Sequence, residues 1–394
     1  MINWLVSCFV VIGLATNIVL GQPFIDRSLG FFSSTDKSRY SGRSIDFVDR
    51  SMNGNWQQRS AAANAERAQW KLSHRFQGGW EYDSNIFESS SRRAATGSGR
   101  FLLNTRGDRR STRWQAHYNY SAALQAYNGY RQENKLSHDL SGSLGARLQP
   151  WLHLSAQAGG TLKFYLENAA DYGTTSGQVA ASFFLPHHLT AELSGETGQL
   201  DYAVTDLYDF TFDGAELTLR RPLAANGSVE MALNRRELRY KRRALNYTSK
   251  QGLFPGPLAQ REALTTARVA MTYGRKVVMQ LAAETQRNRS NSFGYDFNRF
   301  RVSGLLGFRP APGWMLRAAA LVQKKRYRDD LSRFNLRDLD TEREQSNFLV
   351  VDLSRDLSAE ISAVARAAFY DNESTVPGVF YHKTIFFTGV EIRL

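Results

Sequence analysis

The stretch WQAHYNYSAALQA, residues 114–126, alternates between apolar and polar side chains. An apolar or aromatic side chain occupies every second position from Trp114 to Ala126, whereas Gln115 and Asn119 lie on the other parity. Alternation with a period of two predicts a β-strand with one apolar and one polar face. The run is longer than the roughly five or six residues of an average globular strand and reaches the roughly 9–11 residues with which a tilted strand crosses a bilayer.

The same alternation recurs from Trp70 to Leu394. Its clearest further runs are 70–82, 135–148, 152–162, 179–185, 269–283, 300–308, 314–322, 361–369 and 386–394. Short connections are expected at 107–108, 149–150, 186–188, 222–227, 274–275, 310–313 and 355–356. Longer polar connections are expected near 83–96, 127–134, 167–174, 199–209, 241–262, 288–297, 328–343 and 371–380. Because short and long connections alternate, the pattern predicts about sixteen strands, with about 14 to 18 allowed.

A closed sheet is the membrane-spanning structure that suits this part of the chain. In hydrocarbon, backbone amides must pair within the protein, which only helices and closed sheets achieve. Mean hydropathy is −0.42, and only 2–20 forms an apolar run of helical spanning length. Aromatic residues near the strand ends, such as Trp80 and Trp151, suit the girdles at the two interfaces. We therefore predict an all-β, antiparallel transmembrane β-barrel over 69–394, with short periplasmic turns and long extracellular loops.

The N-terminal segment INWLVSCFVVIGLATNIVL, residues 2–20, carries no charged side chain and indicates an export signal. We predict a signal peptide at 1–21, cleaved near Gly21, with an uncleaved helical anchor as the alternative because no Lys or Arg precedes the apolar run. Residues 22–68 are polar without a sustained period, which predicts a flexible periplasmic extension. The single cysteine, Cys8, lies inside the predicted signal, which excludes a disulfide framework and a cysteine nucleophile from the mature chain.

The charge balance is basic, with 50 Lys and Arg against 37 Asp and Glu and a formal net charge of +13. Such a balance indicates polyanionic neighbours without choosing among them. No nucleic-acid partner is expected, because an exported chain meets little of it and the basic residues are spread over many strands. The expected partners are outer-membrane lipid and lipopolysaccharide, together with small polar or anionic solutes and, as a further candidate, a periplasmic export partner.

The polar parity of the predicted strands is expected to face the bore. A barrel of about 16–18 strands is wide enough for an aqueous lumen. The residues expected to line it are Arg75, Arg113, Arg147, Lys163, Arg268, Arg301, Arg317 and Arg366. Inward acids are fewer, and a positive excess lowers the barrier for anions. The alternative is a plugged barrel whose inward charges pair with one another across strands.

No pattern for catalysis or metal binding stands out. His187 and His188 are adjacent, so their rings diverge, and in Ser137-His138-Asp139 the histidine lies on the opposite strand face from its neighbours. The nucleophile-elbow, zinc-protease and P-loop motifs do not occur. We predict no catalytic, cofactor-binding or metal-binding residues, and that the chain is not an enzyme. A constellation assembled from distant strands is the alternative.

The stretch GGWEYDSNIF, residues 78–87, contains the word Y-D-S-N-I-F at 82–87. This word resembles one in Gram-negative outer-membrane barrels of the β-barrel porin group, and similar words occur in surface lipoprotein assembly modifiers and in barrels linked to exopolysaccharide export. Assembly modifiers carry an N-terminal helical repeat domain, for which 22–68 is too short. From the residues themselves, Asp83-Ser84-Asn85 predicts a turn whose side chains cap local backbone amides.

These observations predict a pore or porin-like channel in the cell outer membrane for small polar or anionic solutes. The alternative is a non-conducting barrel that serves as an anchor or an export and assembly partner for a polysaccharide or surface protein. An integral membrane hydrolase is a third hypothesis. The basic segment 241–262 is expected to be a long loop that either folds into the lumen as a constriction or faces lipopolysaccharide phosphates.

Overall fold

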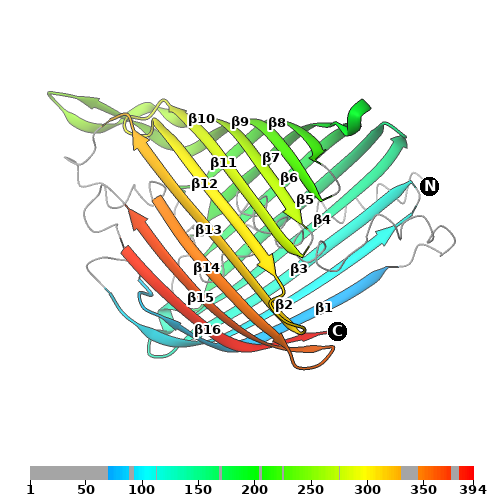
Figure 1. Ribbon diagram of the computed structural model, residues 1–394. Coiled ribbons are helices and arrows are strands. Elements are labelled where there is room, and N and C mark those ends of the chain that lie inside the picture. Colours follow the sequence, from blue (N-terminus) through cyan, green and yellow to red (C-terminus); the bar gives the residue numbers. More distant parts are fainter. Residues whose placement is uncertain are drawn as a thin grey trace, which may run out of the picture.

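The computed structural model describes residues 70–87, 93–111, 113–167, 171–203, 206–223, 226–274, 276–329, 345–373 and 381–394. The strands form one closed antiparallel barrel, in which each strand pairs with its neighbours in the sequence and the first pairs with the last (Figure 1). The predicted signal peptide, 1–21, and the predicted extension, 22–68, lie outside the described residues. Within the described ranges, no helix is long and apolar enough to cross a membrane.

The barrel contains sixteen strands, which confirms the fold class predicted from the alternation. The first eight are β1 (Lys71–Asp83), β2 (Thr96–Arg110), β3 (Trp114–Tyr127), β4 (Lys135–Gln149), β5 (Leu152–Tyr165), β6 (Tyr172–Phe184), β7 (Thr190–Tyr202) and β8 (Phe210–Leu223). The second eight are β9 (Gly227–Thr248), β10 (Gly252–Gly274), β11 (Val277–Ser290), β12 (Phe297–Phe308), β13 (Trp314–Tyr327), β14 (Gln345–Asp356), β15 (Ile361–Glu373) and β16 (Tyr381–Arg393). Short 3-10 helices lie at Arg131–Glu133 and Pro186–His188.

The seam between β1 and β16 closes the barrel and depends on two glycines. Gly79 pairs directly with Gly389. A Cβ atom on Gly79 would lie 2.2 Å from the Thr388 carbonyl oxygen, so a side chain has no room there. Further along the seam, His74 and Leu394 exchange two backbone hydrogen bonds of 2.8 and 2.9 Å. Closure in this way removes the free sheet edge that would otherwise present unpaired backbone groups.

The exterior of the barrel is apolar. Large hydrophobic side chains such as Leu140, Leu193 and Leu281 are exposed at alternating positions. In β1, Trp80 is 52% exposed, whereas the next residue, Glu81, is fully buried. An apolar surface of this extent is more stable in hydrocarbon than in water. The closed sheet also pairs its backbone N–H and C=O groups within the protein. The chain therefore forms a transmembrane β-barrel.

Two expected turns lie elsewhere along the chain. Gly107 and Asp108 lie within β2 and pair with β3, and the connection between these strands occupies 111–113. Turn-forming residue types remain in the strand here because a tyrosine ring of β3 packs over the glycine. The turn expected at 355–356 lies instead at 357–360, between β14 and β15.

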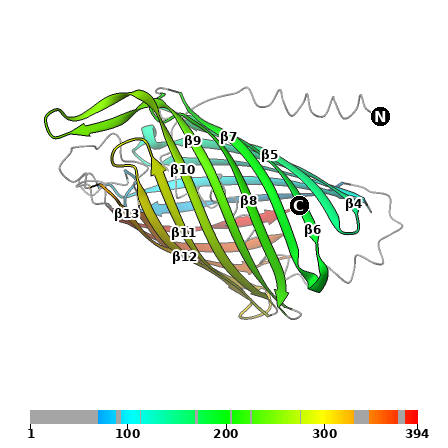
Figure 2. The ribbon, with the colours of Figure 1, turned by 90° about the horizontal axis from the view of Figure 1, so that it is seen from above.

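The segment 241–262, expected to be a long loop, is a two-stranded hairpin for most of its length. β9 continues to Thr248 and β10 begins at Gly252. Shifts in register between Pro255 and Ala259 absorb the Pro-Gly-Pro sequence without ending the hairpin. The hairpin projects past the rim of the barrel and away from it (Figures 1 and 2). This segment is therefore not a constriction folded into the lumen.

Candidate functional site

The polar parity of the strands forms an interior wall on which carboxylates lie between arginines. Glu284 of β11 lies 2.8 Å from Arg301 and 3.4 Å from Arg299, both on β12. Two further carboxylates have this arrangement, namely Glu230 with Arg268 and Arg220, and Glu391 with Arg393 and Arg75. At Glu230 and Glu284, two guanidinium groups contact one carboxylate, which leaves a net positive charge on the wall. At Glu391 the charges balance, because Arg393 also lies 3.4 Å from Asp356.

Other charges on the wall form pairs across strands. Arg366 donates a 2.5 Å hydrogen bond to Asp352. Arg317 lies in register with Asp352 on the other neighbouring strand. Arg236 contacts Glu196 at 3.0 Å and also lies 4.5 Å from the centroid of an aromatic ring on β8. Pairing across strands, which the plugged-barrel alternative requires, is thus present in the wall.

The residues predicted to line the lumen fall into two groups. Seven occupy strand positions of polar parity, and these are Arg75, Arg147, Lys163, Arg268, Arg301, Arg317 and Arg366. The eighth, Arg113, is exposed in the connection between β2 and β3, where strand parity does not define an inward side. Arg147 is also exposed, with its guanidinium 5.8 Å from the ring of Phe184.

Near the long connections lies a set of aromatic and cationic side chains, of which only Lys163 was singled out from the sequence. We name it the mouth collar, and its members are Tyr127, Lys135, Lys163, Tyr165, Tyr172, Tyr208, Tyr240, Arg242, Tyr295, Phe297, Lys325 and Tyr327. The guanidinium of Arg242 lies 5.7, 4.5 and 5.0 Å from the ring centroids of Tyr208, Tyr240 and Tyr295. Such cation–π contacts hold cations in place where water is largely excluded.

Part of the mouth collar can be recognised from the sequence. Cations and aromatic residues two positions apart, as in Lys163 with Tyr165 and Lys325 with Tyr327, lie on the same face of a strand. Lys163 is 2% exposed, and its ammonium lies 4.9 Å from the ring centroid of Tyr165. Contacts from other strands, such as the 5.6 Å approach of Lys163 to Tyr172, have no counterpart in the sequence. The contacts between collar residues of different strands are therefore known only from the fold.

Beside the seam, β1 contributes a buried polar cluster. Glu81 is fully buried and its carboxylate lies 2.7 Å from Arg100, which is 2% exposed. Gln125 donates hydrogen bonds to Glu81 at 2.7 Å and to Ser98 at 3.0 Å. These contacts tie β1, β2 and β3 together on the interior side of the barrel.

The residues of the Y-D-S-N-I-F word also hold the seam. The backbone N–H of Asn85 donates to the Asp83 carboxylate at 2.9 Å, which confirms the predicted turn with side-chain capping. Ser84 exchanges two hydrogen bonds with the backbone of Thr384, one through its side chain and one through its N–H. The Asn85 amide donates to the His382 carbonyl at 3.3 Å. The word thus joins the end of β1 to the beginning of β16.

His138 does not form a catalytic group with Ser137 and Asp139, its neighbours in the sequence. His138 is within 2.9 Å of the Tyr120 hydroxyl, on the exterior parity, whereas Asp139 accepts a 2.5 Å hydrogen bond from Thr161 on the interior parity. Within the described ranges, no group of three or more His, Cys, Asp or Glu side chains is close enough to hold a metal ion.

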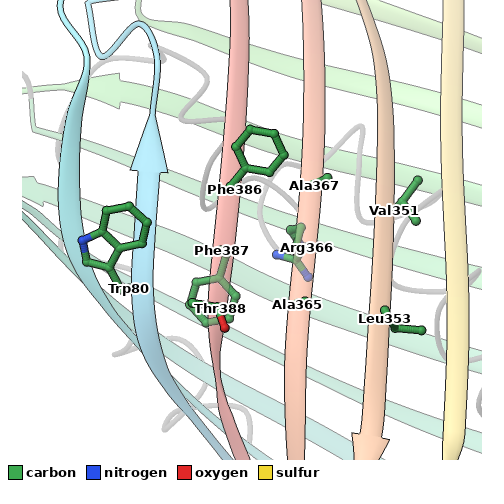
Figure 3. A pocket seen from close by; sticks show the side chains of 9 residues that line it. All are labelled: Trp80, Val351, Leu353, Ala365, Arg366, Ala367, Phe386, Phe387 and Thr388. Carbon is green, nitrogen blue, oxygen red and sulfur yellow. The ribbon is translucent and has the colours of Figure 1, made fainter.

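A hollow of about 300 Å³ lies on the exterior over β14, β15, β16 and β1 (Figure 3). Ala365 and Ala367 leave room between Val351 on one side and Phe386 and Trp80 on the other. Because Phe386 and Trp80 are 46% and 52% exposed, the hollow belongs to the apolar outer surface. Arg366 of the charged wall also lines the hollow, between the two alanines on β15.

Fold and wall together define a closed, antiparallel transmembrane β-barrel with an apolar exterior and a charged, arginine-rich interior. No protein-family model and no curated protein sequence matches the chain. OmpF of Salmonella typhi, in complex with daunomycin, is 8% identical, over 83% of this chain and 98% of that chain, with a TM-score of 0.45.

Two other solved structures give similar values. OprD of Pseudomonas aeruginosa is 11% identical, over 84% of this chain and 97% of that chain, with a TM-score of 0.41. A bacterial polysaccharide outer membrane secretin is 8% identical, over 82% of this chain and 98% of that chain, with a TM-score of 0.43. At these values the similarity assigns neither a family nor a function to the chain.

Proposed function

We propose that the barrel is an outer-membrane channel for small polar or anionic solutes. The observation that carries this proposal is the contact of two arginines with a single interior carboxylate, at Glu230 and at Glu284. A hydrated bore with a fixed positive excess lowers the energy of an anion inside it and raises that of a cation. A sixteen-stranded barrel has the circumference that such a bore needs.

The outer membrane is the proposed location. The apolar exterior requires a bilayer, and the predicted signal at 1–21 directs the chain to export. In this orientation the short connections face the periplasm and the long ones face outward. The proposal includes no enzymatic step, in keeping with the prediction that the chain is not an enzyme.

A second candidate, a non-conducting anchor or an export and assembly partner, is favoured by a different observation. Several interior side chains near the long connections are almost completely buried, among them Gln125 at 0%, Asn288 at 1% and Lys163 at 2%. Side chains in an open aqueous bore would be more exposed. Tight packing on this part of the wall is expected of a barrel whose lumen is blocked.

Conductance separates the two candidates. The full chain is refolded, its folded state is verified by heat-modifiable migration in electrophoresis, and it is inserted into planar bilayers under a salt gradient. Steady conductance with a reversal potential of anion-preferring sign supports the channel. Folded protein that shows no conductance over a range of voltages and salt concentrations would refute the channel proposal and support the anchor.

A further inference from the structure

The exterior of β9 to β13 changes from apolar to cationic toward the long connections. On β9, the outward residue Leu233 is 54% exposed, and the next outward position is Arg235, at 67%. On β13, Val322 is 64% exposed and is followed on the same face by Lys324 and Arg326, which are also exposed. The outward cations of this part also include Lys241, Arg243 and Arg289. We name six of the outward cations the basic flank, namely Arg235, Arg239, Arg261, Arg287, Lys324 and Arg326.

Strand register places five of these cations in two rows, and Lys324 lies outside them. Thr265 of β10 pairs with Arg235 on one side and with Arg287 on the other. Arg261 of β10 pairs directly with Arg239 of β9. Neighbouring strands lie about 4.8 Å apart, so cations on alternate strands are about 10 Å apart. This spacing suits an anionic headgroup that carries more than one phosphate.

Few acidic groups neutralise the basic flank. Arg235 and Arg239 have carboxylate neighbours, at 3.5 Å and 2.9 Å, but both side chains remain more than half exposed. Among the residues that the structure describes, the side chains of Arg261, Arg287 and Arg326 make no ion pair or hydrogen bond. The flank thus presents a cationic surface with free donors.

The rest of the barrel has no counterpart to this surface. On the long-connection half of β1 to β8 and β14 to β16, the described outward positions carry no lysine or arginine. Apolar residues such as Trp80, Leu124 and Phe386 stand at the corresponding positions. If these cations served only a general attraction of the barrel to a charged membrane surface, they would not need to be confined to β9 to β13.

We propose that the basic flank binds the phosphorylated headgroup of an anionic lipid whose acyl chains lie on the apolar surface of the same strands. The apolar surface below the flank includes Met231, Val269 and Leu281, each about half exposed. A soluble polyanion would use the cations alone, whereas an anionic lipid uses the cations and the apolar surface in one pose. Guanidinium groups bind phosphate through two parallel hydrogen bonds, which adds geometric selectivity. This binding does not depend on whether the lumen conducts.

The test uses the full chain, folded in neutral detergent micelles and titrated with bis-phosphorylated lipid A, and bound lipid is counted by native mass spectrometry. The flank variant is Arg287→Gln with Arg326→Gln. Its matched control is Arg221→Gln with Lys276→Gln, which removes two exposed cations at the opposite end of the barrel. Each cation near a charged lipid surface contributes about 1 kcal/mol, so the flank variant is expected to bind about thirtyfold more weakly.

The proposal stands if the flank variant loses this affinity while the control binds as the wild type does. It is overturned if the flank variant binds lipid A as tightly as the wild type. It is also overturned if inositol hexakisphosphate, a soluble polyphosphate, binds the wild-type flank as tightly as lipid A, or if the flank variant only dissociates a dimer of the barrel. Heat-modifiable migration of each variant shows that it is folded before binding is compared.

Discussion

Replacement of Glu81 with alanine is expected to destabilise the barrel strongly, because it leaves a buried guanidinium without its carboxylate. Glu81 is fully buried, Arg100 is 2% exposed, and their charged groups are 2.7 Å apart. Removing one partner of such a pair costs about 3–5 kcal/mol. The lost 2.7 Å hydrogen bond from Gln125 adds about 1 kcal/mol. The expected loss in free energy of unfolding is therefore about 4–6 kcal/mol.

Urea-induced unfolding in phospholipid vesicles, followed by tryptophan fluorescence, measures this loss. The matched control is Glu237→Ala, which breaks the Arg235–Glu237 pair, whose side chains are 67% and 56% exposed. An exposed pair is worth at most about 1 kcal/mol, so the control is expected to change little. The reasoning is refuted if Glu81→Ala costs no more than the control.

A double variant, Glu81→Leu with Arg100→Met, tests the cause of the loss. Because it leaves no buried charge, it is expected to recover most of the stability that Glu81→Ala loses. A double variant as unstable as the single one would show that packing at this position, and not the unpaired charge, determines the effect.

Three further predictions address the wall, the seam and the mouth collar. Glu284→Gln is expected to increase anion preference and Arg301→Gln to decrease it, measured as opposite shifts in reversal potential; shifts of the same sign would contradict the proposed wall charge. Gly79→Val is expected to prevent closure and abolish heat-modifiable migration, whereas Gly99→Ala, with its nearest contact at 3.8 Å, folds normally. Arg242→Met is expected to lower the free energy of unfolding by about 1–3 kcal/mol through lost cation–π contacts, and an unchanged urea midpoint would argue against them.

The structure also places charge differently on the two faces of the barrel. Inside, arginines pair with carboxylates, two to one at some places, or pack against aromatic rings, as Arg301 does with Glu284 and Arg242 with Tyr240. Outside, Arg287 and Arg326 are exposed on one side of the barrel only. The proposed channel rests on the first arrangement and the proposed lipid contact on the second, so the two are tested separately.

Strand alternation made the architecture predictable. Side chains of a strand point alternately to two faces, so runs such as 114–126 report both the strand and its apolar side without knowledge of its partners. The connections were less certain, because the residue types that favour turns also occur within strands. Gly107 stays inside β2 under a tyrosine ring, and the Pro-Gly-Pro sequence at 255–257 stays inside a hairpin through local shifts in register.

The sequence alone determined that this chain would form a long-stranded antiparallel barrel, with an apolar outside and a basic inside, because a period of two is a local property. Only the tertiary structure decided which charges meet, since the contact between Arg100 and Glu81 and the approach of Arg242 to Tyr295 depend on strand register and closure. It also decided that, at the end of the barrel with the long connections, the outward cations of the described strands gather on β9 to β13. A shift of one residue in any pairing would reverse the face of every side chain on that strand, and this choice is made by the folded sheet as a whole.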